Sequence, residues 1–209
     1  MYKRQQRSIA PQLIAVSKRH SSEAIADAVR QGLTEFGENY VQEALEKMAE
    51  LSNPAITWHF IGPIQSNKTR SIAEHFAWVH SVDREKIARR LNDQRPSSLP
   101  ALNVCLQVNM QNEDSKSGVS EASLLELAQV TANQPNLKLR GLMFIPAKAT
   151  NYQEHLKTCH QARALFDMLQ HQYPEIDTLS LGMSADLEAA IHAGSTMVRI
   201  GTDIFGARS

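Results

Sequence analysis

The sequence lacks a surplus of charge of either sign, because its 209 residues include 22 lysines and arginines and 22 aspartates and glutamates. Proteins that bind nucleic acids generally carry a basic surplus that neutralises phosphates, and proteins that bind membrane surfaces usually present a cationic face. A neutral total charge supports neither nucleic-acid binding nor membrane binding. A small molecule is the better expectation for the main ligand, with no nucleic-acid or membrane partner.

Cysteines and long apolar runs are also scarce. Only Cys105 and Cys159 are present, so no disulfide framework is predicted, and we expect a cytoplasmic location. The longest stretch without a charged residue, residues 51–67, contains prolines and polar side chains and cannot cross a bilayer. His155 and Cys159 lie one helical turn apart, but two ligands make a weak metal site, and we predict no metal.

No repeat, low-complexity block or flexible linker divides the chain, which predicts one domain over residues 1–209. Within it, short apolar runs alternate with longer amphipathic segments. The apolar runs predict eight strands, at residues 13–17, 35–38, 57–61, 78–81, 102–108, 138–144, 178–181 and 197–200. The amphipathic segments predict seven helices, at residues 22–31, 40–50, 68–75, 84–93, 121–132, 152–172 and 184–193.

This alternation predicts the fold. Strands that alternate with helices pair in parallel through right-handed crossovers, and eight such units close naturally into a barrel. We therefore predict a single-domain (β/α)8 TIM-like barrel. An open doubly wound sheet with fewer strands is the alternative, because residues 35–38 and 178–181 are short for strands. In a β/α barrel, binding and catalytic residues lie where the strands end.

Lys18 stands at the end of the first apolar run. Alternation puts Ile14, Val16 and Lys18 on one face, so Lys18 points into the barrel mouth if Val16 points into the barrel. Partial loss of water there would lower the pKa of the amine and make it nucleophilic toward carbonyls. The alternative is a solvated loop lysine, which is the commoner role of lysine.

Glycine-bearing turns follow the last two runs, at residues 182–184 and 201–206. Loops after strands seven and eight of β/α barrels commonly bind phosphate through backbone amides and hydroxyls. Ser184 is also predicted to cap a helix over residues 185–193. Ordinary turn and capping chemistry is therefore the alternative to a phosphate site.

Arg199 lies inside the last apolar run, on the same face as Gly201, and a buried guanidinium requires an acceptor. Either a carboxylate within the barrel or a bound ligand would supply it. A lysine at the mouth and a phosphate-binding rim together describe a site for a phosphorylated aldehyde. Pyridoxal 5′-phosphate (PLP) fits this description, and so does the sugar-phosphate substrate of an aldolase.

Eight motifs are spread along nearly the whole chain, at residues 13–18 (LIAVSK), 36–43 (FGENYVQE), 58–68 (WHFIGPIQSNK), 80–83 (HSVD), 115–118 (SKSG), 141–143 (GLM), 179–186 (LSLGMSAD) and 198–208 (VRIGTDIFGAR). In this order they resemble the YggS/PROSC family of pyridoxal phosphate homeostasis proteins. The resemblance implies a barrel similar to the barrel half of alanine racemase. It also implies a role in intracellular PLP (vitamin B6) homeostasis.

The resemblance further implies roles for individual residues. Lys18 matches the family lysine that carries PLP as a Schiff base, and Arg199 matches the arginine that donates to the pyridine nitrogen of the cofactor. The phosphate-binding positions correspond to Ser184, Gly201 and Thr202. Further positions around the cofactor correspond to Asn39, His59 and Met183.

The same resemblance bears on catalysis. A cationic donor against the pyridine nitrogen disfavours protonation of that nitrogen, which makes the ring a poor electron sink. Racemases of this fold also recruit a tyrosine from a second domain, for which a chain ending at Ser209 leaves no room. We therefore expect a carrier that holds and releases PLP without robust turnover and has no catalytic residue. A PLP-dependent amino acid racemase is the alternative.

Release of the cofactor requires an acceptor. Lys116, in the loop after the fifth apolar run, is expected to serve as a second lysine that takes the aldehyde in transit. The alternative is that Lys116 only orders its loop or contacts an anion. PLP-dependent apo-enzymes are the candidate recipients of the released cofactor.

The start of the chain departs from the family pattern. Family members usually begin with an amphipathic helix of several turns, whereas only 12 residues precede Leu13 and Pro11 interrupts them. We expect that helix to be shortened or missing, which would expose apolar surface at Leu13, Ala15, Val198 and Ile200. The chain is then expected to be a monomer or to self-associate weakly.

Overall fold

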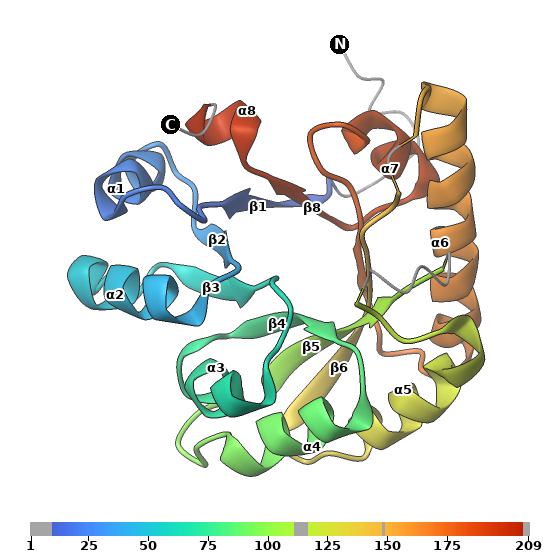
Figure 1. Ribbon diagram of the computed structural model, residues 1–209, viewed down its shortest axis with the longest axis horizontal. Coiled ribbons are helices and arrows are strands. Elements are labelled where there is room, and N and C mark those ends of the chain that lie inside the picture. Colours follow the sequence, from blue (N-terminus) through green and yellow to red (C-terminus); the bar gives the residue numbers. More distant parts are fainter. Residues whose placement is uncertain (1–9, 111–116, 148, 207–209) are drawn as a thin grey trace.

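The computed structural model describes residues 10–110, 117–147 and 149–206, and it contains a closed barrel of eight parallel strands (Figure 1). Each strand pairs with the next one in the chain, and the last pairs with the first. This confirms the predicted (β/α)8 barrel. The strands are β1 (Gln12–Val16), β2 (Glu35–Glu38), β3 (Thr57–Phe60), β4 (Trp78–Val82), β5 (Leu102–Val108), β6 (Leu137–Phe144), β7 (Thr178–Ser180) and β8 (Met197–Ile200).

The helices lie outside the ring of strands (Figure 1). Each of the predicted helices forms, with ends within three residues of the expected ones: α1 (Ser22–Arg30), α2 (Val41–Leu51), α3 (Thr69–His75), α4 (Glu85–Gln94), α5 (Leu124–Ala132), α6 (Tyr152–Gln172) and α7 (Leu187–Ala193). Short 3-10 turns, η1 (Ser66–Lys68) and η2 (Glu121–Ser123), precede α3 and α5. A short helix, α8 (Thr202–Phe205), occupies residues that were expected to form only a turn.

Side chains of the strands pack on two sides, as alternation requires. Inside the barrel, five buried residues form one cluster: Ile14, Trp78, Cys105, Met143 and Met197. The other faces of the strands pack against the helices in a larger cluster, in which the rings of Phe60 and Phe76 lie 5.3 Å apart. The barrel interior is therefore a filled core below its mouth.

A register shift lies in the pairing of β5 with β6, between Val104 and Cys105. Cys105 pairs with Gly141, which has a φ of +147° and lies beside the amino end of β7, where a Cβ would come within 2.0 Å of the Thr178 carbonyl oxygen. Only glycine fits this position without a clash. The preceding residue, Arg140, stacks 4.4 Å from the centre of the Trp78 ring and forms an ion pair with Asp177. The opposite, carboxyl end of the strands, called the mouth below, is left for a ligand.

The expected exposure of apolar strand surface is wrong for three of the four residues. Ala15, Val198 and Ile200 are 0, 4 and 5% exposed, and Leu13 is half-buried. Val198 packs against the connection into α7, because a Cβ at Gly182 would lie 3.3 Å from its Cγ1 atom. Residues 1–9 lie outside the described residues, so a shortened or missing N-terminal helix stays a prediction.

Two other expectations concern metals and membranes. Within the described ranges, no helix is long and apolar enough to cross a membrane. The same residues contain no group of three or more His, Cys, Asp and Glu side chains that could hold a metal ion. Cys159 is buried in the helix-side core, and burial raises the pKa of its thiol to about 12.

Candidate functional site

Apart from His59, which lies in β3, and Lys116, the residues predicted for the site lie along one arc of the mouth. They lie in or after four strands that are neighbours in the barrel, in the order β7, β8, β1 and β2. Because parallel strands end at the same rim, residues distant in sequence come together there. Met183 and Ser184 follow β7, Arg199 lies in β8 with Gly201 and Thr202 after it, Lys18 follows β1, and Asn39 follows β2.

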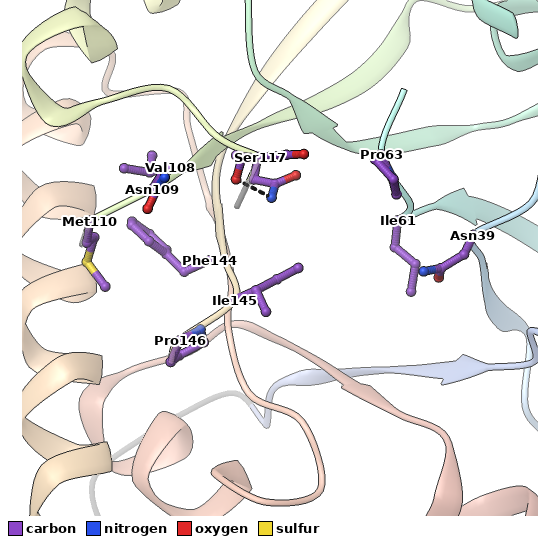
Figure 2. A pocket seen from close by; sticks show the side chains of 11 residues that line it. Asn39, Ile61, Pro63, Val108, Asn109, Met110, Ser117, Phe144, Ile145 and Pro146 are labelled. Atoms are coloured by element: carbon purple, nitrogen blue, oxygen red, sulfur yellow. Dashed lines mark hydrogen bonds between the residues drawn. The ribbon is translucent and has the colours of Figure 1, made fainter. Parts of the chain in front are cut away.

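A cavity of about 200 Å³ opens at the mouth (Figure 2). Figure 2 shows Asn39 and Ile61 on one wall and Val108, Phe144 and Ile145 on the other. Of the predicted residues, Asn39 lines this cavity, and its Oδ1 atom is buried without a hydrogen-bond partner among the described residues. The cavity therefore adjoins the predicted arc and extends toward β5 and β6. Lys116 lies outside the described residues.

Lys18 follows β1 at the mouth and is half-buried. A Cβ at Gly201 would lie 3.4 Å from the Val16 Cβ atom, whereas the Ser17 hydroxyl donates to Glu38 Oε1 at 2.6 Å, so these two neighbours face different sides. Because Lys18 lies in a turn beyond the end of the strand, its orientation into the barrel stays a prediction from alternation.

A buried ionic cluster anchors the backbone around Lys18. The Lys47 cluster consists of Ser17, Glu38, Glu43 and Lys47. Lys47 Nζ donates to the Ser17 carbonyl oxygen at 2.8 Å, to Glu38 Oε1 at 2.8 Å and to Glu43 Oε1 at 2.6 Å. Glu43 Oε1 also accepts from the Arg19 amide at 2.5 Å, and Arg19 has a left-handed φ of +63°. The cluster thus holds the chain on both sides of Lys18.

Glu38 is the member of the Lys47 cluster whose burial as a charged group is most unfavourable. Its side chain is 0% exposed, and burial raises the pKa of the carboxyl group. Hydrogen bonds from Lys47 and Ser17 and the charge of Lys47 oppose that shift. A buried carboxylate requires such compensation, since an unpaired charge in a protein interior is strongly unfavourable. The position of the Ser17 and Arg19 backbone therefore depends on Lys47.

Arg199 lies inside the barrel and is 4% exposed. It donates to Ser180 Oγ at 2.6 Å and to the Phe144 carbonyl oxygen at 2.8 Å. Burial lowers the pKa of its guanidinium to about 10, against the opposing charge of Asp186, so the group stays cationic at neutral pH. Its described hydrogen bonds thus go to a hydroxyl and a carbonyl, and not to the barrel carboxylate that sequence analysis considered.

The predicted cap at Ser184 is wrong. Helix α7 begins at Leu187, and Ser184 lies exposed in a turn before it. The turn is held by the Asp186 amide, which donates to the Met183 carbonyl oxygen at 3.1 Å, and by Asp186 Oδ1, which accepts from the Met183 amide at 2.8 Å. These bonds delay the start of the helix by three residues. They leave the Ser184 hydroxyl without a capping role.

Sequence analysis missed a buried chain of polar side chains beneath the mouth. Glu35 Oε2 lies 2.6 Å from His59 Nε2, His59 Nδ1 lies 2.9 Å from His80 Nε2, and His80 Nδ1 lies 2.9 Å from Ser180 Oγ, which accepts from Arg199. Both histidines are 0% exposed. His59, which was predicted among the positions around the cofactor, takes part in this chain. The sequence signal for this chain is a polar residue at an inward-facing position in each of three apolar strands, namely Glu35 in β2, His80 in β4 and Ser180 in β7.

Burial keeps both rings neutral. It lowers the pKa of His80 well below the ordinary 6.5, and electrostatic interactions with His59 and with the Arg199 cation lower that pKa further. It also lowers the pKa of His59, although the hydrogen bond and charge of Glu35 oppose the shift. At neutral pH, each ring therefore donates through one nitrogen and accepts through the other.

Acid should destabilise the fold through these rings. The unfolded chain binds a proton to His80 below about pH 6.5 while the folded protein does not, so stability present above that pH falls as the pH drops. The expected slope is about 1.4 kcal/mol per pH unit for each such histidine. Urea unfolding between pH 7.5 and 5.5 should show that the free energy of unfolding of His80→Asn depends less steeply on pH than that of the unchanged protein. The exposed His75, changed to Gln, is the control, and equal slopes in all three proteins would contradict the prediction.

Comparison with known proteins places the chain. It matches the family "Alanine racemase, N-terminal domain" over residues 2–209. It is 58% identical over 201 residues to the pyridoxal phosphate homeostasis protein of Vibrio alginolyticus, covering 94% of this chain and 86% of that protein. The chain belongs to the pyridoxal phosphate homeostasis protein family. This confirms the resemblance inferred from the eight motifs.

Solved structures agree with membership of this family. PipY of Synechococcus elongatus PCC7942, solved with PLP bound, has a TM-score of 0.88 and 40% identity, covering 96% of this chain and 95% of PipY. Alanine racemase from Corynebacterium glutamicum has a TM-score of 0.73 and 14% identity, covering 93% of this chain and 55% of the racemase. The second likeness shows a shared barrel fold and nothing about activity.

Proposed function

We propose that this chain binds PLP at the mouth of the barrel and acts in PLP homeostasis. One observation carries the proposal: Lys18, a half-buried primary amine, follows β1, and Arg199, a buried cation, lies in the neighbouring strand β8. The donor set suits the cofactor, because an amine can bond its aldehyde and a guanidinium can donate to a ring nitrogen. The Oδ1 atom of Asn39 at the same mouth is buried and has no hydrogen-bond partner among the described residues, which suits a polar ligand.

Lys18 is proposed to hold the cofactor covalently. Its neutral amine attacks the aldehyde carbon, so that a C=N bond forms and one water leaves. Attack on the same carbon by another amine breaks the bond to Lys18 and returns the lysine to its free form. The Lys47 cluster supports this role because it fixes the backbone at Ser17 and Arg19.

The neighbouring residues are proposed to hold the rest of the cofactor. Arg199 donates to the pyridine nitrogen, and Asn39 offers its amide beside the ring. Met183 and His59 are assigned to further positions around the cofactor, and His59 also belongs to the buried chain of polar side chains that ends at Arg199. The phosphate is assigned to three residues after β7 and β8: Ser184, Gly201 and Thr202.

The site is proposed to carry the cofactor without robust catalysis. PLP supplies an aldehyde for amines and, when its ring nitrogen is protonated, an electron sink for substrate carbanions. The Arg199 cation disfavours that protonation, and the curated relatives are named for homeostasis and not for a reaction. PLP-dependent apo-enzymes are the proposed recipients. A cytoplasmic location is proposed because Cys105 and Cys159 are both buried free thiols.

The absorption spectrum of the purified protein tests the proposal. Incubation with PLP followed by gel filtration should leave a yellow protein, and borohydride should remove the visible band by reducing the C=N bond. Peptide mass spectrometry should then find one cofactor on Lys18. A colourless protein after gel filtration, or label spread over surface lysines, would overturn the proposal.

The same preparation tests the absence of turnover. With free cofactor removed, L-alanine or L-serine should show no racemisation above that of PLP alone in solution. Racemisation at ordinary enzymic rates would support the racemase alternative and leave PLP binding intact.

A further inference from the structure

The buried chain of polar side chains runs from one end of the barrel to the other. Glu35 lies at the start of β2, at the amino end, and its side chain is 20% exposed. His59, His80 and Ser180 connect it to Arg199 through contacts of 2.6 to 2.9 Å. These five residues, named the relay here, link solvent at the amino end to the buried guanidinium beneath the mouth.

The two ends of the relay fix its direction. A guanidinium has only donors, so Arg199 must donate to Ser180 Oγ. An ionised carboxylate has only acceptors, so His59 must carry a proton on Nε2 and donate it to Glu35. At neither end of the relay can the donor and the acceptor exchange roles.

The middle of the relay then has one solution. Because His59 is neutral and protonated on Nε2, its Nδ1 atom accepts, and His80 must donate from Nε2. His80 is also neutral, so its Nδ1 atom accepts from the Ser180 hydroxyl. Ser180 has one proton to give to His80 and a lone pair for Arg199. Every hydrogen bond of the relay thus points from Arg199 toward Glu35, and the four ring nitrogens and the Ser180 hydroxyl each have a partner.

We infer that Glu35 is a positioning residue, whose carboxylate sets the direction of the relay and thereby orients the Arg199 guanidinium for the ring nitrogen of the cofactor. The inference rests on the proposed function for the identity of that ligand. Glu35 touches neither the cavity nor the predicted arc, so it acts through His59, His80 and Ser180. A neutral residue in its place can donate as well as accept, which allows the relay to reverse.

Reversal would disturb Arg199. In the reversed relay, both rings carry the proton on Nδ1, and His80 donates to Ser180. The two lone pairs of the Ser180 oxygen would then accept from His80 and Arg199, and its own proton would need an acceptor outside the relay. The hydroxyl would have to rotate to find one, which changes how it holds the guanidinium.

The direction is tested by two-bond proton–nitrogen NMR correlations of the histidine rings, recorded without added cofactor at neutral pH. His59 and His80, assigned from His59→Gln and His80→Gln proteins, should both be neutral and protonated on Nε2. Glu35→Gln should add a population protonated on Nδ1, and Glu35→Asp should restore the Nε2 form. Glu50→Gln, an exposed residue at the end of α2, is the charge-matched control and should change neither ring.

The link to the ligand is tested by PLP affinity. Loss of an outer-shell partner weakens binding at metal sites by about 10-fold or more, and Glu35→Gln should weaken PLP binding by about 10-fold, with rescue by Glu35→Asp. Glu50→Gln should bind as the unchanged protein does. A merely structural role of Glu35 would lower the melting temperature without moving the ring protons.

The outcomes separate the two proposals. A proton on Nδ1 of either ring in the unchanged protein, or Glu35→Gln that leaves both ring protons and PLP affinity as they were, would overturn the inference. If the unchanged protein fails to bind PLP, the proposed function falls, and the NMR result still decides the direction of the relay. If the ring protons move from Nε2 to Nδ1 in Glu35→Gln and the PLP affinity of that variant falls as well, both the inference and the proposed function are supported.

Discussion

Replacing Lys18 with alanine should abolish the covalent attachment of PLP and leave the barrel folded. The amine that would bond the aldehyde carbon is lost, whereas the Lys47 cluster grips the backbone of Ser17 and Arg19 and not the Lys18 side chain. The stability change should stay within about 1 kcal/mol, as for most substitutions outside the core. Absorption after gel filtration and the mass after borohydride measure the loss, and a thermal melt checks the fold.

Lys138→Ala is the matched control. Lys138 is exposed near the start of β6, at the opposite end of the barrel from the mouth, and its loss should leave the band and the label on Lys18 unchanged. In the Lys18→Ala protein, residual label on Lys116 would support the second lysine proposed for transit. Label at full stoichiometry on any lysine of that protein would contradict the assignment of Lys18.

Much of the fold follows from periodicity in the sequence. Each strand is short and apolar, and each is followed by an amphipathic segment, so the order of elements and their parallel pairing could be predicted. Alternation along β1 also agrees with the structure at Val16 and Ser17, which face opposite sides. The positions of residues at the mouth could be predicted for the same reason, because the ends of the strands form the mouth.

The relay could not be predicted, because it depends on how strands meet across the barrel. Periodicity shows that His80 and Ser180 point inward, but 100 residues separate these contacting side chains. Which inward residues touch is set by strand tilt and register, including the shift at Gly141. The cap expected at Ser184 failed for a local reason, because Asp186 bonds to the Met183 amide and delays α7.

Replacing Lys47 with methionine should lower the free energy of unfolding by about 3–5 kcal/mol, the usual cost of removing one partner of a buried ion pair. Lys47 is 7% exposed and Glu38 is 0% exposed, so methionine would fill the space but leave Glu38 without its cation. The Ser17 carbonyl would also lose its donor. PLP binding should weaken with it, because the chain beside Lys18 would no longer be anchored.

The loss of stability in Lys47→Met should depend on pH, and the titration of Glu38 determines whether it grows or shrinks as the pH rises. Burial already raises the pKa of this carboxyl group above its ordinary 4.5, and removing Lys47 removes its hydrogen bond and its charge, which oppose the shift, and leaves only the Ser17 hydrogen bond to oppose it. The folded protein then binds the proton more tightly than the unfolded chain, so stability falls as the pH rises through the folded pKa. Urea unfolding should therefore show a larger deficit for Lys47→Met at pH 8 than at pH 5.

Two variants make this prediction decisive. Adding Glu38→Gln to Lys47→Met removes the unpaired charge, so it should restore part of the stability and flatten the pH dependence. Lys86→Met, at an exposed site in α4, should change stability by no more than about 0.5 kcal/mol. A deficit for Lys47→Met of less than about 1 kcal/mol that is equal at both pH values would show that the Lys47 cluster does not anchor the Lys18 segment.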